Sequence, residues 1–245
     1  MNSEMTKLDG SLVDHAIATV RGHIRSHDLK VGDSLPGEGH FATILGVSRA
    51  VMREAFGALA ALRLIDVGNG RRPRVGAIDG SVIGASLDHA VATSQISVAE
   101  IWDVRRTLEV RIAALAAEKR TDAQAESIMS LAEAMAQADG DMARVTAYDT
   151  AFHQVIAEAT GNMLFTQIVR SFAPQMEIAV PRAWATRQTE EEKARILTHH
   201  QNIADAIAKR DPERATGAMI EHFDAAVGDL LHGQKGHWSA RPNGT

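Results

Sequence analysis

The spacing of hydrophobic positions in the first 80 residues predicts three helices and a hairpin. Apolar side chains recur there every three to four residues, as they do on the buried face of an amphipathic helix. The expected helices cover residues 11–27, 37–45 and 49–62, and the expected strands cover residues 64–67 and 74–77. Helix, turn, helix and hairpin in this order form a winged helix-turn-helix.

After residue 79 the helical periodicity continues without sustained strand alternation, so this part is expected to be all helical. We expect a connecting helix or linker first and six longer helices after it. These segments cover residues 79–93, 98–119, 122–138, 141–160, 163–180, 190–209 and 212–231. The predicted fold class is mainly α, with an N-terminal winged helix-turn-helix followed by an all-α helical-bundle domain.

The same pattern divides the 245 residues into four segments. We expect the winged helix-turn-helix in residues 1–78, a connection in 79–96, the helical domain in 97–232 and a loosely ordered tail in 233–245. This length is enough for two small domains.

Composition narrows the classes of function. The chain has no cysteine, which excludes disulfides, thiolate nucleophiles and cysteine-ligated zinc, and which suggests a cytoplasmic protein. The longest apolar run covers residues 112–117, far fewer than the ~20 residues that span a bilayer. Residues 1–7 are polar and lack a secretory signal pattern. We therefore expect no membrane partner.

The formal net charge of −5 is unevenly distributed. Residues 1–78 carry +2, whereas residues 79–245 carry −7. A positive module next to an acidic one is compatible with a polyanionic partner for the first part. A charge of +2 is weak evidence by itself, so the positions of the arginines matter more.

Arginines gather where a winged helix-turn-helix meets DNA. Arg49 and Arg53 lie near the start of the predicted third helix, opposite its apolar face, where a recognition helix reaches base edges. Arg71 and Arg72 lie in the predicted turn between the strands, where they would meet phosphates or the minor groove. Two exposed arginines alone are compatible with a solvated helix face, but the element order and the basic turn favour DNA binding.

Four residues of the helical part form a candidate metal site. Asp149 and His153 lie one helical turn apart in an apolar stripe, where a carboxylate and an imidazole are costly to bury without partners. His200 lies near the core direction of its helix, His199 lies well away from it, and His222 lies at the edge of another apolar stripe. From spacing alone, ordinary core or surface histidines explain these residues better than a metal does.

The first part resembles the DNA-binding domain of GntR-family transcription regulators over residues 10–77. The matching runs are Leu35-Pro36-Gly37-Glu38, Leu45-Gly46-Val47-Ser48-Arg49 and Arg53-Glu54-Ala55. The resemblance implies that Arg49 and Arg53 contact the operator and that Gly70 of the wing approaches the DNA. With Ser48, Arg71 and Arg72, these residues are the candidate DNA-binding set.

The sequence departs from the family pattern at two places. Gly39 and His40 follow Glu38 where the family usually has an arginine that touches DNA. That contact is either missing here or supplied by His40 or the wing. Gly57 stands in a stretch usually occupied by a bulkier residue.

Residues 98–231 resemble the FCD effector-binding domain, which follows this DNA-binding domain in one large GntR subfamily. The matching features are Val104-Arg105-Arg106-Thr107-Leu108-Glu109, Asp149 to His153, His200 to Ile207, and His222. In metal-binding members the matching aspartate and three histidines hold a divalent cation. The resemblance therefore implies a metal bound by Asp149, His153, His200 and His222. Zinc suits this donor set, with nickel or manganese also acceptable.

An effector site is expected beside the metal. One carboxylate and three neutral imidazoles leave a divalent site with a charge of about +1, which suits a small carboxylate or hydroxy-carboxylate. Arg105 lies beside the apolar stripe of its helix, whereas Arg106 points away, so Arg105 is the candidate anchor for a second carboxylate. The alternative for Arg105 is an internal ion pair with a glutamate.

Together these observations predict a ligand-responsive transcription regulator rather than an enzyme. We expect a repressor that binds a palindromic double-stranded DNA operator as a homodimer. One alternative is a metal-dependent hydrolase or lyase, although no obvious general base accompanies the candidate ligands. The other alternative is a metal-free regulator that responds to an apolar acyl ligand.

Overall fold

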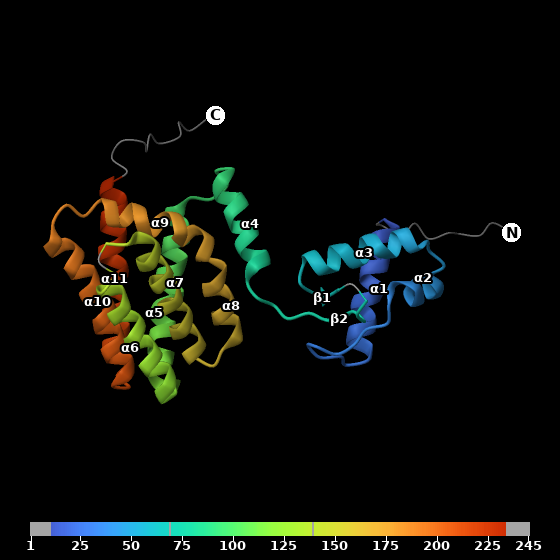
Figure 1. Ribbon diagram of the computed structural model, residues 1–245, viewed down its shortest axis with the longest axis horizontal. Helices are drawn as coiled ribbons and strands as arrows, with labels where there is room; N and C mark the ends of the chain where they lie inside the picture. Colours follow the sequence, from blue (N-terminus) through green and yellow to red (C-terminus); the bar gives the residue numbers. More distant parts are fainter. Residues whose placement is uncertain (1–10, 69, 139, 234–245) are drawn as a thin grey trace, which may run out of the picture. The chain divides into compact units, whose positions relative to one another are not determined.

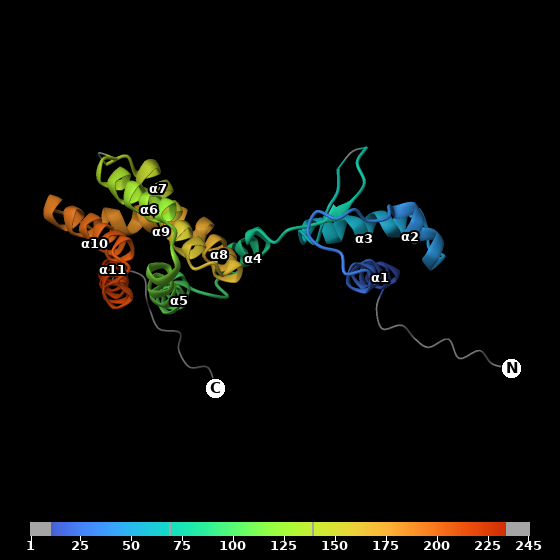
Figure 2. The ribbon, with the colours of Figure 1, turned by 90° about the horizontal axis from the view of Figure 1, so that it is seen from below.

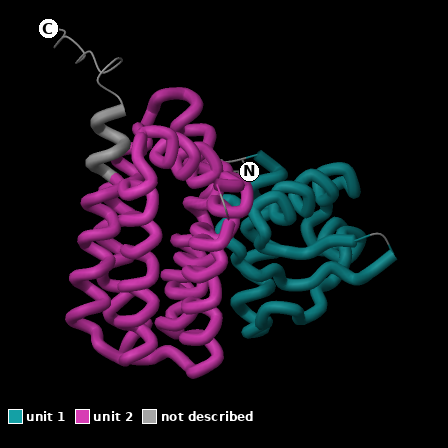
Figure 3. Tube along the Cα trace, turned by 60° about the vertical axis from the view of Figure 1, so that its left-hand side comes forward, with its two compact units in different colours: residues 1–82 teal, residues 83–245 magenta. Residues whose placement is uncertain are grey.

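The protein consists of two compact units, which contain residues Met1–Val82 and Ile83–Thr245 (Figure 3). The computed structural model describes residues 11–68, 70–138 and 140–233, with side chains up to Ala226.

In its described residues, the first unit contains three helices and a two-stranded hairpin (Figure 1). Its elements are α1 (Leu12–Ser26), α2 (Glu38–Leu45), α3 (Arg49–Ala61), β1 (Ile65–Asp66) and β2 (Arg74–Val75). The strands are antiparallel, and Ile65 lies opposite Val75. The helices share one apolar core, in which Phe41, Phe56 and Leu59 are almost completely buried. This arrangement confirms the winged helix-turn-helix.

Local signals place the helix that would enter DNA. Gly46, at the end of α2, has a φ of +65°, in the left-handed region that glycine adopts without strain. Two residues later Ser48 caps α3, and its Oγ accepts a hydrogen bond from the backbone N–H of Val51 at 3.2 Å. The turn and the cap together fix where α3 begins.

The described part of the second unit is all helical. Its helices are α5 (Val98–Lys119), α6 (Asp122–Ala136), α7 (Met142–Ala159), α8 (Met163–Ser171), α9 (Ala173–Ala185), α10 (Glu190–Ala208) and α11 (Pro212–Gly233), preceded by α4 (Ser81–Ala92), which begins in the first unit. Helix α5 packs on α11, α11 on α10, α10 on α6, α6 on α7, and α7 on α5 (Figures 1 and 2). Five helices therefore enclose one apolar core, and α9 contacts both α7 and α11.

Capping residues explain the helix starts. Four helices begin with a capping box, in which a Ser or Thr and the residue three positions later hydrogen-bond each other's backbone N–H groups. These pairs are Ser11 and Asp14, Ser97 and Glu100, Thr121 and Gln124, and Thr189 and Glu192. Each pair satisfies backbone donors that a helix start leaves without partners.

One predicted helix was wrong. The segment predicted as one helix over residues 163–180 forms α8 and α9, which are separated at Phe172. Pro174 has no N–H to continue the hydrogen bonding of α8, and the N–H of Phe172 bonds to the carbonyl of Val169 at 3.1 Å instead. Helix α9 also extends past the predicted end, through Pro181 to Ala185.

Two further predictions concern the chain end and membranes. Of the tail predicted at residues 233–245, only Gly233 lies within the described residues, where it ends α11. Among the described residues, no helix is long and apolar enough to cross a membrane.

Candidate functional site

The start of α3 carries the arginines predicted to read DNA. Arg49 and Arg53 are both exposed, whereas Met52 and Phe56 on the other face of α3 are buried in the core of the first unit. The two guanidinium groups therefore lie one turn apart on the outer face of the helix. The hydroxyl of Ser48 caps this helix, so its first role is structural.

The hairpin supplies a second set of exposed positive charges. Gly70 has a φ of +72°, a conformation that favours glycine, and Arg71 and Arg72 follow it on the surface. These three residues line an open groove together with His23 and His40. His40 is thus on the wall of this groove, close in sequence to the position where the family arginine is missing.

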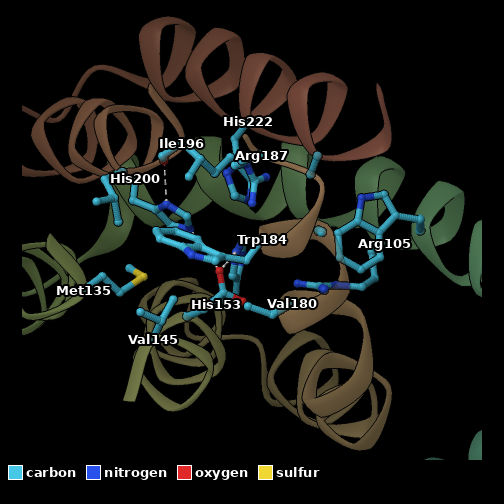
Figure 4. Close-up of a pocket in the computed structure, with 15 residues that line it drawn as sticks. Arg105, Met135, Val145, His153, Val180, Trp184, Arg187, Ile196, His200 and His222 are labelled. Atoms are coloured by element: carbon cyan, nitrogen blue, oxygen red, sulfur yellow. Dashed lines mark hydrogen bonds and ion pairs between the residues drawn. The ribbon is translucent and has the colours of Figure 1, made fainter. Parts of the chain in front are cut away.

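Four residues from three helices of the second unit line one pocket (Figure 4). Asp149 and His153 come from α7, His200 from α10 and His222 from α11, and their exposed fractions range from 2% to 8%. The three histidines each offer a ring nitrogen within 4.8 Å of the others. Asp149 Oδ1 lies 3.0 Å from His200 Nε2 and 3.9 Å from His153 Nε2. The structure therefore brings together all four predicted metal ligands.

The hydrogen bonds around the histidines orient their rings. His200 Nδ1 lies 2.9 Å from the carbonyl oxygen of Ile196, one turn earlier on α10 (Figure 4). If Nδ1 donates its proton to that carbonyl, Nε2 points its lone pair towards the Asp149 carboxylate. Two such acceptors repel each other unless a proton or a metal ion lies near both. His222 Nδ1 is buried and has no hydrogen-bond partner among the described residues.

Arg105 makes the internal ion pair that the sequence left as its alternative. Its Nε lies 2.7 Å from Glu109 Oε1, and both side chains are almost fully buried. The other carboxylate oxygen, Glu109 Oε2, contacts His153 Nδ1. Arg105 also lines the pocket, and its guanidinium lies 5.0 Å from the centre of the Trp102 ring. Arg105 therefore belongs both to the ion pair and to the pocket wall.

Glu109 was missed as a site residue. It lies four positions after Arg105 on α5, a spacing that places both on one helical face. That spacing was the available signal. Its contact with His153 depends on the packing of α7 against α5, which no local pattern predicts. Trp184 and Arg187, which also line the pocket, were likewise not predicted.

Charge interactions keep the two carboxylates ionised. Burial raises the pKa of Glu109, but Arg105 and His153 more than offset this effect and lower that pKa to about 2. Burial likewise opposes ionisation of Asp149, yet its contact with His200 Nε2 at 3.0 Å and the charges of nearby groups lower its pKa to about 2. The pKa of His222 lies well below its ordinary value, chiefly because the ring is buried. The site thus offers an anionic carboxylate beside a neutral imidazole, which are metal-binding forms.

Comparisons with known proteins cover both units. Residues 12–75 match the family described as bacterial regulatory proteins, gntR family, and residues 100–225 match the FCD domain family. The HTH-type transcriptional regulator LutR of Bacillus subtilis is 31% identical over 216 residues, which cover 86% of this chain and 96% of LutR. The HTH-type transcriptional repressor NanR of Cronobacter sakazakii is 31% identical over 208 residues, covering 82% of this chain and 78% of NanR.

A solved structure agrees with these matches. The protein described as Streptococcus agalactiae GntR superposes with a TM-score of 0.62 at 25% identity, covering 87% of this chain and 97% of that chain. The family and the relatives are transcription regulators, so the alternative of a hydrolase or lyase is set aside. The chain belongs to the GntR family of DNA-binding transcription regulators, and an FCD domain follows its winged helix-turn-helix in the sequence.

Proposed function

We propose that this regulator binds a divalent metal ion and a small carboxylate effector in its helical domain, and that effector binding changes its affinity for DNA. The metal ligands are Asp149, His153, His200 and His222. The metal supplies a Lewis-acidic centre to which an effector carboxylate binds. Zinc suits three imidazoles and a carboxylate, and nickel and manganese are the alternatives.

The orientation of His200 carries this proposal. Its Nδ1 is held by the Ile196 carbonyl at 2.9 Å, while its Nε2 faces the Asp149 carboxylate at 3.0 Å. Metal-ligating histidines typically donate the outer N–H to a carbonyl or carboxylate and turn the other nitrogen to the metal. His222 Nδ1, which is buried and has no hydrogen-bond partner in the described part of the chain, supports the same interpretation, since a buried polar atom without a partner is costly.

Arg105 is proposed as the second anchor of the effector. Glu109 accepts from its Nε–H and Met176 Sδ contacts its Nη1, and the guanidinium has three further N–H donors. These donors suit a carboxylate, which accepts paired hydrogen bonds from arginine. The pocket also has apolar walls, including Val145, Val180 and Ile196, which favour a small organic acid over an inorganic anion.

At the DNA end, we propose that Arg49 and Arg53 contact bases in the major groove. Ser48, Gly70, Arg71 and Arg72 lie at the exposed edge that would meet the backbone or the minor groove. A homodimer on a palindromic operator fits this mode, because two-fold symmetry pairs each recognition helix with one half-site. Repression is proposed from the likeness to NanR, a repressor by its name. The effector acts by favouring one arrangement of the DNA-binding units over another.

Metal content tests the proposal directly. Protein purified without chelators and dialysed against zinc should hold one ion per chain by elemental analysis. His200→Ala should lose most of it, because this change removes an inward-facing ligand. His199→Ala is the matched control, since this neighbour is not among the three clustered histidines. Wild-type protein without bound metal, or equal metal in wild type and His200→Ala, would contradict the proposed site.

A further inference from the structure

We infer that Glu109 is a positioning residue that fixes the tautomer of His153 and ties this histidine to Arg105. The inference rests on the proposed metal site and assigns a role to a residue outside its four ligands. Glu109 lies on α5 and His153 on α7, so their contact joins two helices of the bundle.

The two oxygens of Glu109 have different partners. Oε1 accepts a hydrogen bond from Arg105 Nε at 2.7 Å, and Oε2 contacts His153 Nδ1. The three residues are 1% to 3% exposed, so water does not compete for these contacts. A buried carboxylate whose two oxygens each accept from a specific donor is held in one orientation.

This arrangement determines which nitrogen of His153 carries the proton. An ionised carboxylate only accepts hydrogen bonds, so Nδ1 must be the protonated nitrogen of a neutral His153 ring. Nε2 then has a free lone pair. It lies 3.9 Å from Asp149 Oδ1, on the side of the ring that faces the proposed metal site. Glu109 thereby leaves His153 Nε2 unprotonated and able to bind a metal ion, even in the metal-free protein.

The shared carboxylate also links the two proposed anchors of the effector site. Arg105, which would bind the effector, and His153, which would bind the metal, are held by one side chain. A shift of Arg105 on ligand binding therefore acts on His153 through Glu109. By linkage, metal and effector should each change the affinity for the other by the same factor.

The test replaces Glu109 with an isosteric amide. Glutamine has one acceptor oxygen and one NH2 donor, so Glu109→Gln cannot accept from both Arg105 and His153. The charged arginine should retain the oxygen, because charge-assisted hydrogen bonds are stronger. The amide NH2 then faces His153 Nδ1 and favours the tautomer with a proton on Nε2, which cannot bind metal. We expect zinc affinity to fall about 10- to 100-fold, as for other losses of such partners.

Zinc affinity is measured by competition with a chromophoric chelator, with circular dichroism of the metal-free proteins to compare their folding. Glu118→Gln is the matched control, because Glu118 is exposed on the same helix. Its zinc affinity should equal that of wild type. An affinity of folded Glu109→Gln within about twofold of wild type would overturn the inference, whereas absence of zinc from wild type itself would overturn the proposed function.

A second measurement needs no variant. Nitrogen-15 NMR of metal-free wild-type protein at about pH 8 reports the protonation of each histidine nitrogen. We expect His153 to carry its proton on Nδ1 and none on Nε2. A proton on Nε2 would overturn the assigned role of Glu109, even if Glu109→Gln failed to fold.

Discussion

The protonation of His222 is determined by the groups that surround it in the pocket. It is 5% exposed, and its Nδ1 has no partner among the described residues. Its ring lies 4.5 Å from that of His200 and 5.2 Å from that of His153, measured between ring centres. Burial and these neighbours both disfavour a proton on the ring. His222 is therefore kept neutral, which is the form that the proposed metal site requires, at a cost in acid stability.

That cost predicts a pH dependence of the metal-free protein. Burial lowers the pKa of His222 in the folded state, whereas the unfolded chain takes up a proton near pH ~6.5. Below that pH the unfolded state binds more protons, so the free energy of unfolding falls as the pH decreases. Thermal melts with a chelator, from about pH 8 to about pH 5, should show this fall, and His222→Gln should reduce its slope. His15→Gln, at an exposed site, is the control. An identical slope in wild type and His222→Gln would refute the assignment.

The arginines of α3 give a second prediction at this scale. Arg49→Ala and Arg53→Ala should each weaken specific operator binding by ~1–3 kcal/mol at particular base pairs, because each loses a base contact. Fluorescence anisotropy titrations at fixed salt measure the loss. Arg111→Ala removes one exposed positive charge from the helical unit and should bind normally. Undiminished binding by both recognition-helix variants would refute this role for α3.

At the residue scale, periodicity predicted which side chains lie on or near the core-facing side of their helices, but not that they meet. It placed Asp149, His153 and His200 towards the core and His222 at the edge of its apolar stripe, and the resemblance to the FCD domain implied that the four lie together, as they do in the pocket. The role of Glu109 could not be predicted, because it arises from a contact between α5 and α7. Helical spacing fixes the direction of a side chain but not what a neighbouring helix presents to it.

At the scale of elements, the sequence predicted helices well where caps and breakers are local. Four starts carry capping boxes, and Gly46 ends α2 as expected. The prediction failed around Phe172, where one helix was expected and two exist. Proline fits the first turn of a helix, whereas inside a helix it removes a hydrogen bond and usually kinks or breaks the helix. Pro174 lies in the first turn of α9 and Pro181 lies inside the same helix, so a proline does not by itself show whether a helix starts, stops or continues.

Two glycines of the first unit should respond oppositely to alanine. A Cβ on Gly76 would lie 2.3 Å from the carbonyl oxygen of Arg63, so Gly76→Ala must displace backbone beside the hairpin. We expect a loss of about 1–3 kcal/mol in the free energy of unfolding of this unit. Gly57 is helical and has nothing within 4 Å of such a Cβ, so Gly57→Ala should stabilise by about 0.5–1 kcal/mol. Urea titrations followed by circular dichroism measure both. An unchanged free energy of unfolding in Gly76→Ala would show that the backbone beside the hairpin shifts more easily than its packing suggests.

The wing should affect DNA binding differently from α3. Replacing Arg71 and Arg72 together with alanine should weaken binding to all DNA sequences and flatten its salt dependence, as expected when phosphate contacts are lost. Anisotropy titrations at several salt concentrations, on operator and on unrelated DNA, measure both effects. A loss confined to one operator base pair would indicate that the wing reads bases instead.

At the scale of the whole molecule, the two units differ in net charge and in the kind of candidate site that each contains. The first unit carries the exposed arginines of α3 and of the hairpin, and the second carries the acidic excess and the buried histidine pocket. The order of elements and the uneven charge made this division predictable.

The most direct test of the account compares carboxylate binding with and without metal. Small carboxylates and hydroxy-carboxylates are titrated into zinc-loaded and metal-free protein by calorimetry. We predict that at least one acid binds the zinc-loaded protein, and that binding is lost on removing zinc and weakened in Arg105→Met. Arg106→Met, which changes the exposed partner of Asp224, should bind as wild type does. Equal binding of the same acid to zinc-loaded and metal-free protein would contradict a metal-anchored effector site.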